Sequence, residues 1–177
     1  MRIWIILMLT CSLLSGYAMT VENKIVCGYV EKATLLDNLL ASQKSLTLSA
    51  KLDTGAKSAS LSAININQIE KEGKTYLVFT VPSKQGNIEF MSEYVGKVAI
   101  KIRAEEHTHI PHERLKRPVV LIRVRLGNVE RVIPVNLTNR KRFIYPLLLG
   151  RDAINAFNGL IDPARAFILK NEAASPL

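Results

Sequence analysis

The sequence predicts an all-β protein, a closed β-barrel with one short helix near its C-terminal end. Short runs rich in β-branched and aromatic residues follow one another closely, and turn residues separate them. Only residues 151–157 have the pattern and length of a helix. Many short strands at this spacing, with a single helix, are typical of a closed barrel. The chain has no internal repeat, low-complexity tract or linker, so we expect one domain over residues 19–177.

Residues 1–18 have the features of a secretory signal peptide. Arg2 gives a positive start, residues 3–14 are mostly apolar, and Ala18 offers a small residue at the cleavage position. The apolar run is shorter than the ~20 residues that a membrane-spanning helix needs. We therefore expect a periplasmic or secreted protein with no permanent membrane span after cleavage. An uncleaved membrane anchor is the alternative.

The first strands lead to the segment on which the functional interpretation depends. Residues 25–32 form an apolar, strand-like run that contains Cys27. Cys27 is the single cysteine after the signal peptide, so it predicts a small buried side chain, with an intermolecular disulfide as the alternative. Residues 35–45 mix polar and apolar side chains and predict a turn or a short helical piece. Residues 46–53 alternate like a half-buried strand and end in Asp53, although aspartate is a poor strand former.

The remaining elements are expected to be strands joined by turns, followed by the helix. Gly86 and Gly127 lie in two hairpin turns: the first joins residues 76–82 to 88–91, and the second, Gly127-Asn128, joins 119–126 to 129–137. Three other segments should be extended, and one of them is an apolar core strand directly before the helix. These are residues 59–66, 95–103 and 146–149.

Asp53, Thr54 and Gly55 form the candidate site. A strand end holds a carboxylate rigidly, the Thr54 hydroxyl can form hydrogen bonds, and Gly55 allows another backbone to approach. A turn or capping aspartate without chemistry is the alternative interpretation of Asp53.

Asp53-Thr54-Gly55-Ala56 behind an apolar strand resembles the catalytic turn of retropepsin-like aspartic peptidases. Residues 145–154 are similar to the strand, glycine and short helix that close the retropepsin core. Over residues 27–169 the chain resembles one bacterial branch, the RimB-like proteins, which carry the label ATP-dependent zinc protease. The matching segments are Gly28–Glu31, Ala50–Ser58, Arg117–Val119, Leu137–Arg140 and Leu148–Arg151. The resemblance implies a single-lobed acid-protease barrel in which residues 146–149 pack beneath the catalytic turn and Gly150 leaves room for it.

The resemblance also implies hydrolysis of peptide bonds by a water held between two carboxylates. The chain contains one Asp-Thr-Gly, and no other aspartate has that setting (Asp37, Asp152, Asp162). A two-fold homodimer that places Asp53 against Asp53 of a second copy would supply the pair. Thr54 would then hydrogen-bond across the dimer axis. Lys57 is expected to point away from the cleft or to form a basic wall for an acidic substrate. The flap over the cleft is expected in residues 76–91 or 103–118.

The net charge of the chain limits the classes of partner that we expect. Its 24 Lys and Arg residues exceed its 15 Asp and Glu residues, for a formal net charge of +9. These charges are spread over several segments without a basic helix, so nucleic acid is not expected. We expect instead a peptide or protein substrate, or an anionic surface. An acidic substrate would fit the positive charge of the chain. The alternative is that the charge serves solubility alone.

No cofactor is expected, because the sequence has no glycine-rich loop for phosphate. His107, His109 and His112 could bind a metal, but their spacing is not a usual zinc pattern and Pro111 indicates a loop, so no catalytic zinc is expected. Two rival functions stay open. One is a non-catalytic periplasmic module that binds a peptide or anion on the same barrel, and the weaker is a zinc-dependent hydrolase at the histidines.

Overall fold

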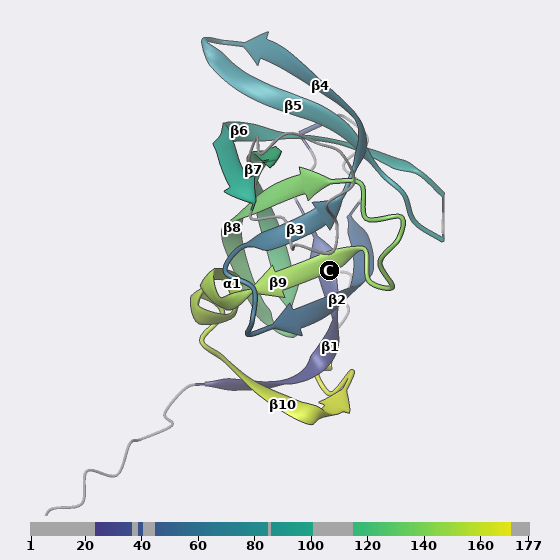
Figure 1. The fold of residues 1–177 in the computed structure, drawn as a ribbon, viewed down its shortest axis with the longest axis vertical. Coiled ribbons are helices and arrows are strands. Elements are labelled where there is room, and N and C mark those ends of the chain that lie inside the picture. Colours follow the sequence, from purple (N-terminus) through teal and green to yellow (C-terminus); the bar gives the residue numbers. More distant parts are fainter. Residues whose placement is uncertain (1–23, 37–38, 41–44, 85, 101–114, 171–177) are drawn as a thin grey trace, which may run out of the picture.

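A computed structural model of the chain describes residues 24–36, 39–40, 45–84, 86–100 and 115–170. Within these residues the chain forms ten strands and one short helix (Figure 1). The expected signal peptide 1–18, Asp37 and the three histidines 107, 109 and 112 lie outside the described residues. The elements are β1 (Ile25–Leu35), β2 (Leu46–Asp53), β3 (Ala59–Ser62), β4 (Ile64–Lys71), β5 (Lys74–Val81), β6 (Ile88–Ile100), β7 (Leu115–Leu126), β8 (Val129–Thr138), β9 (Leu147–Gly150), α1 (Arg151–Ala156) and β10 (Gly159–Ala166).

Six of the strands close into a mixed β-barrel, as the sequence predicts. The neighbours run in the order β1-β2-β9-β3-β8-β7, and an antiparallel pairing of β7 with β1 closes the circle. β2 pairs with β9, and β3 with β8, in parallel, while the other neighbours in the barrel are antiparallel. Because β2 and β9 run side by side in one direction, Asp53 and Gly150 leave the barrel at the same edge.

The barrel interior is apolar, and the alternation of β2 explains which side chains enter it. Every second residue of β2 is buried, while Lys51 and Asp53 point outward. Side chains from the other strands meet those of β2 in one continuous core. The inward residues of β2 are Leu46, Leu48, Ala50 and Leu52. Cys27 is also fully buried, as expected, and burial together with the nearby charge of Glu31 raises its pKa to about 11.

An arm of three strands, β4, β5 and β6, extends from the barrel (Figure 1). The expected hairpin of residues 76–91 is confirmed, because β5 pairs with β6 and Phe79 stands opposite Phe90. Residues 59–66 are extended, as expected, but they belong to two strands, β3 and β4. The chain forms β3 in the barrel, then enters the arm as β4, and Asn65 at a φ of 52° lies near the change of direction. The strands expected at 88–91 and 95–103 are a single strand, β6, with an irregularity between Tyr94 and Gly96.

The sequence did not predict β10. It pairs in parallel with β1 so closely that a Cβ on Gly28 would lie 2.5 Å from the Arg165 carbonyl oxygen. Asp162 and Pro163 lie within β10, and both disfavour strands, which is why the sequence pattern concealed it. After β10 the backbone N–H of Phe167 donates to the Val30 carbonyl at 2.8 Å, so the chain stays on β1.

The structure confirms the predicted turn at Gly127-Asn128 and the predicted helix. Gly127-Asn128 joins β7 to β8 with Leu126 opposite Val129, and Gly127 has a φ of 57°. The expected helix over residues 151–157 is α1, and Phe157 caps its C-terminal end. This helix is too short to cross a membrane, and it is the only one in the part of the chain that the structure describes.

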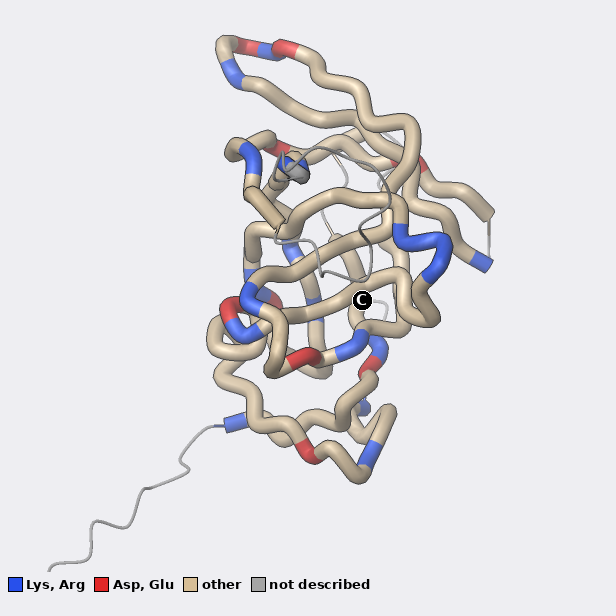
Figure 2. Tube along the Cα trace, in the orientation of Figure 1, with Lys and Arg blue, Asp and Glu red and all other residues tan. Residues whose placement is uncertain are grey.

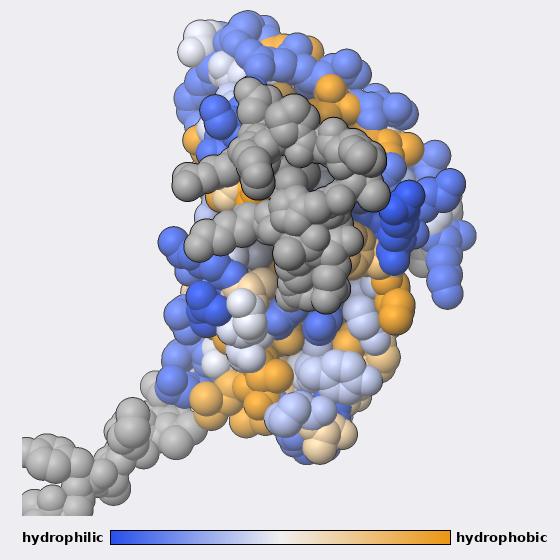
Figure 3. Space-filling view, in the orientation of Figure 1, coloured by the Kyte–Doolittle hydropathy of each residue, from blue (hydrophilic) through white to orange (hydrophobic). Residues whose placement is uncertain are grey.

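The surface combines scattered positive charge with local apolar exposure. Lys and Arg positions are spread over the barrel and the arm rather than gathered in one patch (Figure 2). Apolar side chains gather on the end of the barrel that carries β10 (Figure 3). Val26 of β1 and Leu160 of β10 are register partners there, and they are 49% and 38% exposed.

Candidate active site

Asp53 is the last residue of β2, and its carboxylate is held by the turn that follows it. The backbone N–H of Gly55 donates to Oδ1 at 2.9 Å, and the N–H of Ala56 donates to the Asp53 carbonyl at 3.2 Å. The Asp53 side chain is 27% exposed. Thr54 and Gly55 are exposed beside it. The structure therefore brings together the three residues that the sequence singled out, in an aspartate-initiated turn with an accessible carboxylate.

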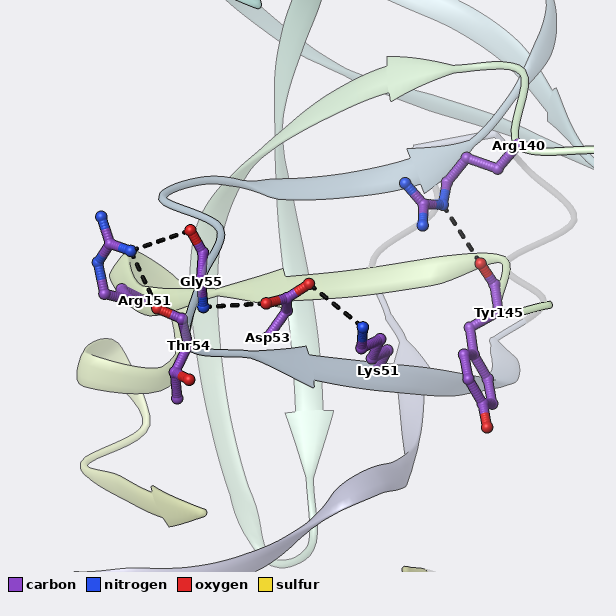
Figure 4. A network of polar contacts seen from close by, with 7 residues as sticks. All are labelled: Lys51, Asp53, Thr54, Gly55, Arg140, Tyr145 and Arg151. Atoms are coloured by element: carbon purple, nitrogen blue, oxygen red, sulfur yellow. Dashed lines mark hydrogen bonds and ion pairs between the residues drawn. The ribbon is translucent and has the colours of Figure 1, made fainter. Parts of the chain in front are cut away.

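The N-terminal turn of α1 fixes this loop from the other side (Figure 4). Nη1 of Arg151 donates to the carbonyl of Thr54 at 2.9 Å and to that of Gly55 at 3.2 Å. Its backbone N–H donates to the Ala56 carbonyl at 2.9 Å, and the N–H of Asp152 donates to the Lys57 carbonyl at 3.0 Å. Four hydrogen bonds thus tie the turn after Asp53 to α1. Sequence reasoning matched Leu-Leu-Gly-Arg to the family but assigned no role to Arg151.

Gly150 allows this close contact. A Cβ at this position would lie 2.7 Å from the backbone C and O of Lys57 and from the carbonyl oxygen of Ser58. Real Cβ atoms do not approach backbone atoms so closely, so a larger residue would force the two segments apart. The expectation that Gly150 leaves room for the turn is confirmed.

The cation in contact with Asp53 is Lys51, which the sequence interpretation overlooked in favour of Lys57. Nζ of Lys51 lies 3.5 Å from Oδ2 of Asp53, because residues two apart on a strand point to the same face. Burial raises the pKa of Asp53, but the Gly55 N–H and the Lys51 charge outweigh it, so the pKa lies below its ordinary value. A single chain therefore carries Asp53 as an ionised carboxylate at neutral pH.

A second carboxylate does not join Asp53 within the described residues. Asp152 is exposed in the first turn of α1, and Asp162 of β10 accepts the N–H of Ala164 at 2.9 Å. The same part of the chain holds no cluster of three or more His, Cys, Asp and Glu residues that could bind a metal. One chain thus supplies one carboxylate at this turn, whereas aspartic peptidase chemistry uses two.

Arg140 is a further charged residue beside the site that sequence reasoning missed. It follows β8, it is only 6% exposed, and its guanidinium lies in front of β3, the neighbour of β9, on the face to which Asp53 and Lys51 point (Figure 4). Burial lowers the pKa of Arg140, the charge of Arg117 lowers it further, and the charge of Asp53 raises it. Leu137–Arg140 was one of the segments that matched the family, and this was the available signal.

Comparisons with known proteins agree with this geometry. A family model described as retropepsin-like aspartic endopeptidase RimB matches residues 27–172. The chain is similar to a crystal structure of a protein of unknown function from Legionella pneumophila, with a TM-score of 0.69 and 57% identity over 84% of this chain and 99% of that one.

Two curated relatives have a different name. Each is called a probable alpha-L-glutamate ligase, one from Shewanella pealeana and one from Shewanella halifaxensis. Each is 29% identical over 122 residues, which cover 69% of this chain and 26% of the relative. The chain therefore spans about a quarter of the length of the curated relatives it matches.

Proposed function

The chain belongs to the RimB-like family of retropepsin-like aspartic endopeptidases, and from that premise we propose that it hydrolyses peptide bonds with Asp53 of two chains. The observation that carries this proposal is the setting of Asp53. The carboxylate stands at a strand end, accepts the Gly55 N–H at 2.9 Å, and belongs to a turn that Arg151 holds in place.

The chemistry requires a homodimer. Two carboxylates a few Å apart cannot both be charged, so they share one proton and titrate as a pair. The ionised member takes a proton from the attacking water, and the protonated member polarises the substrate carbonyl. A two-fold axis beside the turn brings Asp53 of both copies together. Thr54 is proposed to hydrogen-bond across that axis, and Gly55 to give water and substrate access.

The substrate proposed is an acidic peptide or protein. Lys51 lies 3.5 Å from the Asp53 carboxylate, and Arg140 is close enough for the two charges to interact. Positive charge around a cleft raises the local concentration of anionic substrates. The curated relatives are named glutamate ligases, and a ligase of this kind acts on an acidic amino acid. Export through the segment 1–18 would place the enzyme in the periplasm or outside the cell, which stays a proposal.

A binding module without cleavage is the second candidate, and the Lys51–Asp53 ion pair favours it. Within one chain Lys51 already pairs with the Asp53 carboxylate, and this positive charge favours the ionised form of Asp53. An ionised carboxylate has no proton with which to polarise a substrate carbonyl. Under this alternative the barrel binds a peptide or anion and releases it unchanged.

Cleavage of a glutamate-rich peptide by the purified full chain and by Asp53→Asn separates the two functions. We expect Asp53→Asn to fold normally and to lose cleavage by at least about a thousandfold, as expected for loss of a residue that acts on the attacking water. Equal cleavage by both proteins would refute the proposal. Peptide binding by a wild-type protein that never cleaves would establish the alternative.

The shared site has its own test. Mixing a fixed amount of wild-type chains with an excess of Asp53→Asn chains should lower the cleavage rate, because a mixed dimer has only one Asp53 carboxylate. Activity in proportion to the wild-type chains alone would show that each chain works independently. Loss of activity to a chelator with recovery in zinc would point to the histidines instead.

A further inference from the structure

Arg140 is a buried cation whose position is fixed by three contacts. Its backbone N–H donates to Oγ of Ser62 at 3.3 Å, and its Nε donates to the Tyr145 carbonyl at 3.2 Å. The guanidinium carbon lies 4.3 Å from the centre of the Phe143 ring, a cation–π contact. A long side chain that is held in this way has already lost its rotamer freedom, so it can bind a ligand without a further entropic cost.

The fixed guanidinium retains hydrogen-bonding capacity. Among the described residues its one side-chain hydrogen bond is from Nε, so the Nη1 and Nη2 groups have no protein acceptor there. Buried charges are normally paired, because burial without a partner is costly. Asp53 contacts Lys51 at 3.5 Å and is not hydrogen-bonded to Arg140. The Nη1 and Nη2 groups can therefore bind an anion that the described chain does not supply.

The neighbouring surface is polar although it is buried. The register places Lys51, Leu148, Ser60 and Asn136 in one row across β2, β9, β3 and β8, on the outer face of the barrel. Ser60 and Asn136 are 4% and 3% exposed, and neither Ser60 Oγ nor Asn136 Oδ1 has a hydrogen-bond partner. Unpaired buried polar atoms are rare and often mark a place for water or a polar ligand.

The orientation of Asn136 reinforces this view. Its Nδ2 donates to the Ala59 carbonyl and to Ser58 Oγ, at 3.4 Å for the latter. The bond to a carbonyl fixes which end of the amide is nitrogen, so the unpaired atom is the oxygen. The outer face of the barrel that carries Lys51 thus presents an unpaired hydroxyl on β3 and an unpaired amide oxygen on β8, which is the composition of a polar binding surface rather than of a core.

We propose that Arg140 binds a carboxylate side chain of the substrate beside the scissile bond and so sets the specificity of this site for acidic residues. The inference rests on the proposed peptidase function. A guanidinium presents two parallel N–H groups that match the two oxygens of a carboxylate, so binding is bidentate and directional. Because Asp53 and Arg140 lie on the same outer face of the barrel, close enough for their charges to interact, a bound glutamate side chain would fix the position of its own peptide bond relative to Asp53 (Figure 4).

The test compares the full wild-type chain with Arg140→Gln and Arg140→Lys on two substrates. One is a fluorogenic peptide of alternating Glu and Ala residues, and the other has Gln in place of Glu. Arg142→Gln is the matched control, because it removes the same charge from an exposed position two residues away. We expect Arg140→Gln to lower kcat/KM for the Glu peptide by about tenfold to a hundredfold, through KM, and to leave the Gln peptide unchanged.

The conservative variant protects the test against a folding defect. Arg140→Lys keeps a positive charge at the site but loses the two parallel N–H groups of the guanidinium. We therefore expect a loss of kcat/KM on the Glu peptide between those of the wild type and Arg140→Gln, and an unchanged melting temperature. Arg142→Gln should match the wild type on both peptides. Equal losses on both peptides in Arg140→Lys or Arg140→Gln would show a structural role and overturn the proposal. So would a wild-type enzyme that cleaves the two peptides equally well.

Binding separates this proposal from the peptidase function. Calorimetric titration of the Glu peptide into Asp53→Asn chains should show binding that is weakened by adding Arg140→Gln. If the wild type binds but never cleaves, an Arg140-dependent affinity still supports the carboxylate site while the peptidase proposal fails. If affinity for the Glu peptide is the same with and without Arg140, the carboxylate site is refuted whether or not cleavage occurs.

Discussion

Glu31 holds the C-terminal segment on the barrel, and we predict that Glu31→Ala will lower the free energy of unfolding by about 4 kcal/mol. The Glu31 side chain is fully buried. Its Oε1 accepts the backbone N–H groups of Gly28 at 2.7 Å and Ile168 at 3.1 Å, and its Oε2 accepts that of Leu169 at 3.2 Å. Truncation leaves three donors without this acceptor and opens a cavity.

The magnitude follows from these bonds. A hydrogen bond to a charged group contributes about 1.5–3 kcal/mol, and the three share one carboxylate, so their sum overestimates the loss. Ile168 and Leu169 are half-buried, and water can replace part of what they lose. Glu31→Gln keeps one acceptor oxygen for Gly28 and Ile168 but sets an amide N–H₂ against Leu169, so its cost should be about 2 kcal/mol.

Urea unfolding followed by circular dichroism measures the free energies of unfolding of the variants. Amide hydrogen exchange shows which residues lose protection. Glu93→Gln is the control, because Glu93 is 43% exposed and 3.9 Å from Lys74, where the loss should stay below about 1 kcal/mol. The amides of Ile168 and Leu169 should exchange faster in Glu31→Ala. If Glu31→Ala is as stable as Glu93→Gln, the carboxylate does not hold the segment and the reasoning is wrong.

Two further predictions concern the turn. Lys51→Met should raise the pKa of Asp53 in the isolated chain, as a carboxyl ¹³C titration would show; an unchanged pKa would remove Lys51 as a cause. Because the folded pKa lies below the ordinary one, the stability that Asp53 contributes is present above the ordinary pKa and is lost as pH falls through the folded pKa. In Lys51→Met the folded pKa is higher, so the loss should be smaller and should be complete at a higher pH. Gly150→Ala should cost about 1–3 kcal/mol in urea unfolding, since its Cβ would meet backbone at 2.7 Å. Gly159→Ala, with its nearest contact at 3.4 Å, should cost clearly less, and equal costs would contradict the packing argument.

The local features of the site could be predicted because each depends on residues near in sequence. Alternation places Asp53 at the end of an amphipathic strand, and β2 begins and ends where the pattern predicted. The Gly127-Asn128 turn and α1 follow in the same way from turn chemistry and helix length. The dimer, the signal peptide and the flap stay predictions.

Contacts between distant segments could not be predicted in this way. Residues 59–66 are all compatible with extended structure, so nothing local indicates that β3 and β4 join different partners. β10 is a strand in spite of Pro163, because pairing with β1 at the edge of the sheet outweighs its weak local preference.

The barrel class and the Asp53 turn follow from the amino-acid sequence alone, because period-two alternation and turn residues act over a few neighbours. Lys51 follows in the same way, because it lies two residues before Asp53 on one strand. The charges from distant segments near Asp53 depend on the tertiary structure. Arg151 lies 97 residues from Thr54 and reaches the turn through parallel pairing of β2 with β9, and Arg140 follows β8, which pairs with β3. Burial of Glu31 depends in the same way on a segment more than 130 residues away. Electrostatics and packing act through space, and the spacing of residues along a chain does not contain those distances.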